Sequence, residues 1–195
     1  MTRSLMTAAV VILLAAGTAA QDTQPTCRMC PGAYIGNEEV EAYLARARAN
    51  NLVDQQLRSV DIGRSNVAIG LVHRGKLAAP APSSVAEHDL VSEVYHVISG
   101  SATLVTGPEI VDARRRPADN IAVRFLNGPG QNAASIRNGT THQLKAGDVI
   151  VIPAGTGHWF TKIDDHITYL MIRVDPDKVT PLKDEAASKA DLMKK

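Results

Sequence analysis

The spacing of apolar residues changes once along this chain, near residue 50. Before that point four apolar residues recur at three- and four-residue intervals: Val40, Tyr43, Leu44 and Ala47. This period is typical of one face of a helix. Asn37 is a suitable N-cap, and the two acidic residues after it favour a first helical turn. The pattern predicts one helix over about residues 38–49.

Beyond residue 50 the apolar residues fall into short runs that glycine, proline and polar residues separate. Runs of this kind predict strands, here at residues 60–62, 67–72, 93–98, 102–105, 121–125, 149–152 and 167–172. The Ser-Gly-Ser sequence at 99–101 is expected to turn the chain back, so that the strands on either side form a hairpin. Residues 107–119, with three consecutive arginines at 114–116, are expected to form a solvated loop.

Many short strands separated by such turns indicate an all-β sandwich or barrel of the jelly-roll type, preceded by an arm and a helix. The run at 149–152 is expected to be a buried strand because all four of its residues are apolar. The residues after 177 are charged and rich in alanine, and they are expected to form either a loose helix or a disordered tail.

The first twenty residues resemble a signal peptide. Arg3 gives a positive start, an apolar run follows at 8–16, and small residues offer a cleavage site before Gln21. We therefore expect export to the periplasm or the outside of the cell, with no membrane attachment after cleavage; an uncleaved anchor is the alternative. The expected parts are a signal peptide (1–20), an arm and helix (21–58), a barrel (59–177) and the tail (178–195).

Composition excludes some classes of function. The chain has 195 residues, of which 45% are hydrophobic and 21% charged, so it can bury a core and is not disordered by composition. Only 4% are aromatic, which argues against a surface that stacks nucleic-acid bases. The formal charge of +1 falls to zero when Arg3 is removed with the leader, so no overall field favours nucleic acid.

Cys27 and Cys30 form a Cys-x-x-Cys pair in the expected arm. Outside the cytoplasm a local disulfide is allowed, and it is the expected state. Such a pair can also be redox-active or bind a soft metal. The redox alternative requires a strand before the pair and a helix after it, and a zinc site requires more than two thiolates.

Two segments combine histidine with an acidic residue or a tight turn. In the first, His88 and Glu93 stand at the entry of an expected strand, and an ionised glutamate there is costly unless it is paired or binds a metal. In the second, an apolar strand leads into a Pro-x-Gly turn and then His158. Imidazole and carboxylate together suit divalent first-row metals.

The first segment resembles the first motif of the cupin superfamily, here in the form of a single, type-2-like domain. That motif runs His-x-His, three or four residues, Glu, six residues, Gly. This chain has His88, four residues, Glu93, six residues and Gly100. The first histidine of the motif falls on Ala86, so one of the four usual ligands is missing.

The second segment is similar to the second cupin motif, which runs Gly, five residues, Pro-x-Gly, two residues, His, three residues, Asn. This chain has Gly147, five residues, the turn at 153–155, two residues and His158. The closing asparagine falls on Lys162. The resemblance spans about residues 66–175 and implies a double-stranded β-helix.

The resemblance implies that His88, Glu93 and His158 hold one divalent transition metal ion: iron, manganese, copper, zinc or nickel. Three protein ligands would leave open positions for water or substrate. His96 is a candidate fourth ligand, although strand alternation puts it on the face opposite Glu93. A bulge would bring it in, and in another arrangement the three histidines bind while Glu93 does not.

Alternation places Tyr95 on the same face as Glu93, so Tyr95 is a candidate proton handler; the alternative is a packed strand aromatic. We expect a metal-dependent enzyme acting on a small molecule, of the oxygenase, isomerase or lyase type. The alternatives are a non-catalytic cupin that binds a small ligand or metal, and a redox partner that uses the cysteine pair. The resemblance also implies a homodimer.

Overall fold

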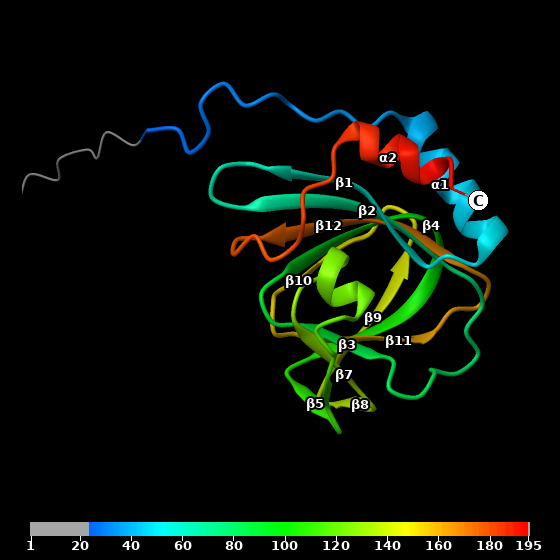
Figure 1. The fold of residues 1–195 in the computed structure, drawn as a ribbon. Helices are drawn as coiled ribbons and strands as arrows, with labels where there is room; N and C mark the ends of the chain where they lie inside the picture. The colour runs from blue at the N-terminus through cyan, green and yellow to red at the C-terminus, as the bar shows by residue number, and fades with distance from the viewer. Residues whose placement is uncertain (1–23, 195) are drawn as a thin grey trace, which may run out of the picture.

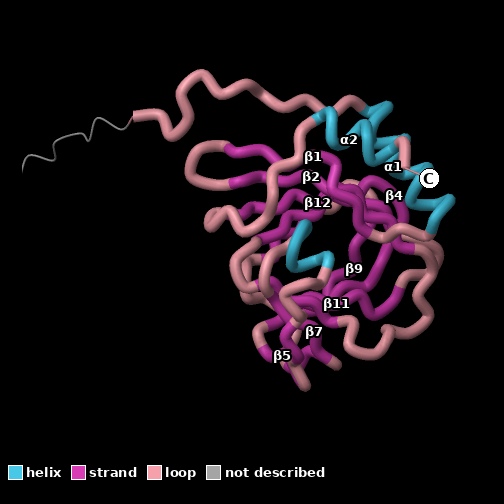
Figure 2. Tube along the Cα trace, in the orientation of Figure 1, coloured by secondary structure: helices cyan, strands magenta, loops and turns pink. Residues whose placement is uncertain are grey.

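Strands dominate the part of the chain that the computed structural model describes, residues 24–194 (Figures 1 and 2). The helical elements are α1 (Asn37–Asn50), the π-helical turn η1 (Ala122–Leu126) and α2 (Glu185–Leu192). The strands are β1 (Asp54–Asp61), β2 (Asn66–Arg74), β3 (Val85–His88), β4 (Ser92–Gly107), β5 (Glu109–Val111), β6 (Arg114–Arg115), β7 (Gly130–Ala133), β8 (Ser135–Arg137), β9 (Thr140–Lys145), β10 (Val149–Ile152), β11 (Gly157–Lys162) and β12 (Ile167–Asp175). The predicted signal peptide lies outside the described residues.

The long strand β4 joins two antiparallel sheets. Its first half pairs with β12 and β10, in a sheet that continues from β12 through β2 to β1. Its second half pairs with β9 and β11, and the second sheet continues from β11 through β3 and β7 to β6. Buried side chains from both sheets form one core, including Val72, Tyr95, Leu104, Phe160 and Tyr169. The predicted all-β fold is confirmed.

The hairpin predicted at residues 99–101 is wrong, because Gly100 bends β4 without reversing it. Its φ of +76° is a left-handed conformation that favours glycine. A Cβ atom there would collide with the backbone carbonyl of His166, so the close approach of that segment also requires glycine. The strand therefore leaves one sheet and enters the other.

Two further predictions between residues 107 and 126 are wrong. The run at 121–125 is not a strand: Asn120 accepts a hydrogen bond from the Ala122 amide, and the chain winds into η1. Ile121 and Phe125 stay exposed, so this apolar run does not enter the core. The expected loop at 107–119 contains the short strands β5 and β6, which pair with β8 and β7.

Strand β10 is only half buried. Val149 and Val151 are 61% and 63% exposed, whereas Ile152 lies in the core. The expectation of a buried strand fails because β10 pairs with β4 alone and ends the sheet there. Strand β1 also begins at Asp54, earlier than the expected barrel start at residue 59.

Helix α1 presents the predicted apolar face to the barrel. Tyr43, Leu44 and Ala47 are buried, and the first two pack with Leu57 of β1 and Leu71 of β2. The N-cap is Gly36 rather than Asn37, and no side chain caps this end of the helix. The helix prediction is therefore confirmed apart from its boundary.

The C-terminal tail is ordered as α2, which lies beside α1 over the outer face of β1 (Figure 1). The Asp184 side chain accepts a hydrogen bond from the Ala187 amide and caps the helix. The Tyr43 hydroxyl donates to the backbone carbonyl of Ser188 at 2.9 Å, which ties the two helices together. No helix within residues 24–194 is long and apolar enough to cross a membrane.

Candidate metal centre

Three strands bring His88, Glu93 and His158 together inside the barrel. His88 ends β3, Glu93 lies near the start of β4, and His158 lies near the start of β11. Glu93 Oε1 lies 3.3 Å from His88 Nε2, and Glu93 Oε2 lies 3.4 Å from His158 Nε2. All three side chains are buried, and their ligand atoms lie within 4.8 Å of one another. The two motifs thus meet in space.

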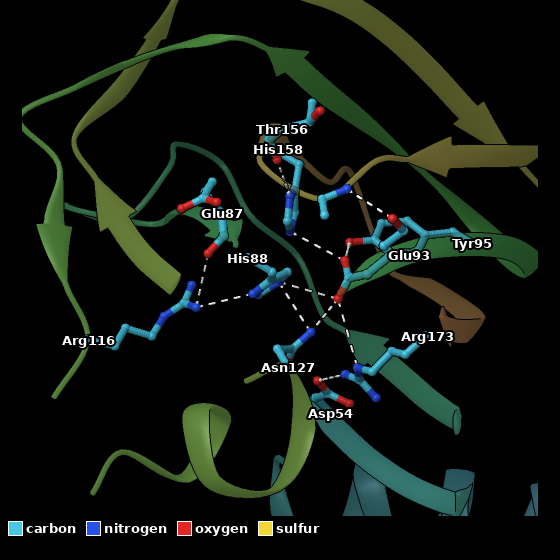
Figure 3. A network of polar contacts seen from close by, with 12 residues as sticks. Asp54, Glu87, His88, Glu93, Tyr95, Arg116, Asn127, Thr156, His158 and Arg173 are labelled. Carbon is cyan, nitrogen blue, oxygen red and sulfur yellow. Dashed lines mark hydrogen bonds and ion pairs between the residues drawn. The ribbon is translucent and has the colours of Figure 1, made fainter. Parts of the chain in front are cut away.

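Hydrogen bonds hold both oxygens of Glu93 (Figure 3). The Tyr95 hydroxyl donates to Oε2 at 2.7 Å, and the Asn127 side-chain amide donates to Oε1 at 2.5 Å. Burial alone would raise the pKa of Glu93, but His88, His158 and Arg173 hold it well below its usual range. Glu93 is therefore an ionised carboxylate at neutral pH.

Arg173 supplies a buried positive charge behind Glu93. Its Nε atom lies 3.9 Å from Glu93 Oε1, and its terminal nitrogens donate to Asp54 and to Gln56 Oε1. A Cβ atom at Gly70 would lie 2.7 Å from the Arg173 Nη1 atom, so this glycine makes room for the guanidinium. Burial of Arg173 is compensated by its two carboxylate neighbours.

His158 is held in the state that a metal ligand requires. Its Nδ1 atom donates a hydrogen bond to the Thr156 carbonyl at 3.1 Å, so the lone pair of the neutral ring lies on Nε2, toward Glu93. Burial lowers the pKa of His158 to about 4, despite the opposing effect of the Glu93 charge. The ring is therefore neutral at pH 7 and available for coordination.

His88 is arranged differently from His158. Its Nδ1 atom lies 3.2 Å from Nη1 of Arg116, which can only donate, so a neutral His88 that accepts from Arg116 carries its proton on Nε2, which lies 3.3 Å from Glu93 Oε1. Coordination through Nε2 requires that proton to move to Nδ1, and Arg116 would then keep its bonds to the Glu87 carbonyl and Asn132 Oδ1. Arg116 therefore competes with a metal for His88.

The donor set and its spacing fit one divalent transition metal ion. Two imidazole nitrogens and a carboxylate are typical ligands, and bonds of about 2.1 Å place tetrahedral ligand atoms about 3.4 Å apart. Each histidine nitrogen lies at about this spacing from one Glu93 oxygen, 3.3 Å to Oε1 for His88 and 3.4 Å to Oε2 for His158, and the ligand atoms all lie within 4.8 Å of one another. A carboxylate has about four acceptor positions, so Glu93 can bind an ion and keep its bonds to Tyr95 and Asn127.

The structure places the remaining sequence candidates around this cluster. Ala86 pairs with His158 across the strands and lines the cavity, where it offers no ligand. His96 is exposed on the outer face of β4 and does not join the cluster, so no bulge brings it in. Lys162 is exposed at the end of β11.

Tyr95 lies at the centre of the site, as alternation predicted. Its ring packs against Tyr169, with centroids 4.4 Å apart, and is nearly parallel to Phe160. Burial and the Glu93 charge raise the pKa of Tyr95 well above its usual value. The phenol is therefore protonated and serves as a hydrogen-bond donor to Glu93.

Cys27 and Cys30 are joined by a disulfide in the arm before α1. Cys30 is exposed, and neither residue lines the cavity beside Glu93. The predicted disulfide is therefore present. The described cluster of potential ligands contains no cysteine.

A cavity of about 430 Å³ opens beside the cluster, and it holds residues that the sequence analysis missed. The polar and charged lining residues besides the three candidate ligands and Tyr95 are Asp54, Arg74, Ser84, Arg116, Asn120, Asn127 and Asn132. Arg116 belongs to the segment that was expected to be a solvated loop, and Asn127 follows the run at 121–125 that was expected to be a strand. The burial of Arg173 could have been predicted, because strand alternation puts it on the same inward face as Tyr169 and Met171.

Comparisons with known proteins gave one family model and a set of solved structures. A model of the AraC-like ligand binding domain matches residues 136–191. A solved protein from Bacillus halodurans is 15% identical, with a TM-score of 0.44, over 82% of this chain and 96% of its own. An RmlC-like cupin with a double-stranded β-helix fold from Methanocaldococcus jannaschii is 12% identical, with a TM-score of 0.38, over 65% of this chain and 85% of its own.

The DMSP lyase DddQ from Ruegeria pomeroyi is 16% identical, with a TM-score of 0.40, over 66% of this chain and 49% of its own. A comparison with curated proteins gave no match. At these identities the likenesses concern the fold alone. The chain has the cupin type of fold that its motifs predicted, with a possible His-Glu-His metal site inside it.

Proposed function

We propose that this protein is a metal-dependent enzyme that acts on a small molecule. The observation that carries the proposal is the buried Glu93 carboxylate, with a histidine nitrogen 3.3 Å and another 3.4 Å from its two oxygens. An ionised carboxylate is costly to bury; Arg173 offsets part of that cost, and a divalent cation bound by His88, Glu93 and His158 would offset more of it beside the cavity.

Three protein ligands leave coordination positions for water or substrate, which is the arrangement of catalytic rather than structural sites. A metal bound there would polarise a substrate oxygen or lower the pKa of bound water. Around it, Asn127 and Tyr95 orient the Glu93 carboxylate, and the Thr156 carbonyl orients His158. The reaction class remains the one proposed from sequence: oxygenase, isomerase or lyase.

The second candidate is a cupin that binds a small ligand without turnover. It is favoured by Arg116, whose bond to His88 Nδ1 gives that histidine a complete set of partners without an ion. Ala86 also leaves the usual fourth ligand position empty of any donor. The family model that matches residues 136–191 describes a ligand-binding domain, which agrees with either candidate.

Export and homodimer formation stay predictions. The leader lies outside the described residues, and the structure holds one chain. The periplasmic or secreted location agrees with the disulfide between Cys27 and Cys30, which an oxidising compartment permits.

Metal content of the purified protein tests the proposal. We expect near-stoichiometric metal in the wild type, after reloading with iron, manganese, copper, zinc or nickel where needed, and loss of that metal in His158→Ala. His96→Ala is the matched control, because His96 is an exposed histidine on β4. A wild type that takes up none of these metals contradicts the proposal and leaves the ligand-binding candidate.

A further inference from the structure

Arg74 brings an unpaired positive charge to the cavity. It lies at the end of β2, two residues after the inward-facing Val72, and lines the same space as Glu93 and His158. Its guanidinium carbon lies 4.9 Å from the centre of the Phe160 ring, and its Nε atom donates to the Tyr169 hydroxyl at 3.4 Å. The aromatic rings thus support the flat side of the guanidinium.

Within residues 24–194 no carboxylate lies within ion-pair distance of Arg74, and its two terminal nitrogens have no hydrogen-bond partner. Two nearby arginines form ion pairs with carboxylates: Arg173 with Asp54, and the exposed Arg115 with Asp89. A guanidinium fork with both terminal nitrogens unused matches the geometry of a carboxylate.

Arg116 approaches the same space from the side of His88. It is partly buried, and among the described residues its partners are neutral: Asn132 Oδ1, the Glu87 carbonyl and His88 Nδ1. Arg74 reaches the cavity from β2, beside Phe160 and Tyr169. Both arginines line the cavity that opens beside the candidate metal centre.

The cavity is lined by two arginines and two carboxylates, and these do not form ion pairs with each other. Its carboxylates are Asp54, which is paired with Arg173, and Glu93, which already faces Arg173 and the two histidines. Arg74 has no carboxylate within ion-pair distance among the described residues, and the charge of Arg116 is offset only by Glu87, Glu93 and Asp89, none of which forms an ion pair with it. A bound metal would add more positive charge to the same space, so the missing partner is an anion.

We propose that the cavity binds a small molecule through a carboxylate group, which Arg74 and Arg116 hold beside the candidate metal centre. This rests on the proposed function in so far as the carboxylate compound is the substrate of that site. The volume of about 430 Å³ suits a small organic acid. The aromatic and aliphatic lining formed by Leu77, Phe160 and Met171 would contact the remainder of such a molecule.

Binding of butyrate, its neutral analogue butyramide, and inorganic phosphate tests the proposal. Each is titrated at constant ionic strength into zinc-loaded and metal-free protein and followed by NMR chemical shifts, which report weak binding. We expect butyrate to bind roughly tenfold or more tightly than butyramide, because charge-assisted hydrogen bonds stabilise only the anion.

Arg74→Gln is expected to weaken butyrate binding by roughly tenfold or more while leaving butyramide unaffected. Arg114→Gln is the matched control: it removes the same charge from an exposed arginine of β6 that lies outside the cavity lining. If Arg74→Gln fails to fold, Arg74→Lys replaces it. A smaller loss of butyrate affinity is then expected, because lysine keeps the charge but lacks the two terminal nitrogens of the guanidinium.

Equal binding of butyrate and butyramide would overturn the proposal, as would wild-type affinity for butyrate in Arg74→Gln. Phosphate binding without butyrate binding would overturn the assignment to a carboxylate. The two proposals fail separately. Arg74-dependent butyrate binding by a protein that takes up no metal supports the carboxylate site and contradicts the metalloenzyme. A protein that takes up zinc but binds butyrate no more tightly than butyramide supports the metal site and contradicts the carboxylate site.

Discussion

The side-chain amide of Asn127 donates to Oε1 of Glu93 at 2.5 Å, and the same nitrogen lies 3.2 Å from Nε2 of His88. Asn127 directly follows η1, whereas Glu93 and His88 belong to strands (Figure 3). A segment outside the two cupin motifs therefore orients the Glu93 carboxylate and contacts a second candidate ligand, His88.

Removing this amide is expected to weaken metal binding. In Asn127→Ala the Oε1 atom loses a donor and the Glu93 carboxylate gains freedom, so metal affinity should fall by about 10–100-fold. Competition with a chelator of known affinity measures the change. Asn50→Ala, at the exposed end of α1, is the control. Unchanged affinity in Asn127→Ala would show that Asn127 does not orient the ligands.

The Tyr95 hydroxyl is expected to stabilise the fold more than it supports metal binding. Tyr95→Phe keeps the packing against Tyr169 but removes the donor to ionised Glu93, so the free energy of unfolding should fall by about 1.5–3 kcal/mol. Urea denaturation measures it, with Tyr34→Phe as the exposed control. Metal content should stay at the wild-type level. A decrease in the free energy of unfolding no larger than that of Tyr34→Phe would contradict the account.

The metal-free protein is expected to lose stability as pH falls below 6.5. The unfolded chain protonates His158 near the usual histidine pKa of 6.5, whereas burial holds the native pKa at about 4. Between these values the unfolded state binds more protons, so the free energy of unfolding decreases with falling pH, by about 2–3 kcal/mol at pH 4.5. The lowered pKa of Glu93 adds a further loss below about 4.5.

Urea denaturation of metal-free wild type and His158→Gln at pH 7 and pH 4.5 tests this dependence. The variant lacks the buried imidazole and should lose correspondingly less stability between the two pH values. An identical loss in both proteins would mean that His158 is not the group that titrates.

The disulfide of the arm is expected to be unimportant for the site. Cys27 and Cys30 lie outside the cavity lining, so replacing both with serine should leave metal content and butyrate binding unchanged. Metal analysis and the same NMR titration check this. Loss of either property in the double variant would revive the redox alternative.

The predictions from sequence succeeded where local pattern and tertiary role coincide. The helical spacing of Tyr43 and Ala47 matches the face that α1 buries. Alternation correctly placed Tyr95 inward with Glu93 and His96 outward, because β4 is regular at that point. The spacing of the two motifs brought His88 and His158 to the same carboxylate.

The predictions failed where long-range contacts decide the structure. Gly100 was interpreted as a hairpin turn, yet its conformation serves the passage of β4 between two sheets and the close approach of His166. The apolar run at 121–125 has the composition of a strand, but no neighbouring strand pairs with it and it winds into η1. Arg116 and Asn127 reach the site from irregular segments, whose placement depends on the complete fold.

Anomalous X-ray diffraction from crystals of the metal-loaded protein tests the central claim most directly. The account predicts one strong anomalous peak at about 2.0–2.2 Å from Nε2 of His88, an oxygen of Glu93 and Nε2 of His158. It also predicts that the Arg116 contact to His88 Nδ1 is released in that state. A peak elsewhere, or no peak with Glu93 still hydrogen-bonded to an Nε2–H of His88, would contradict it.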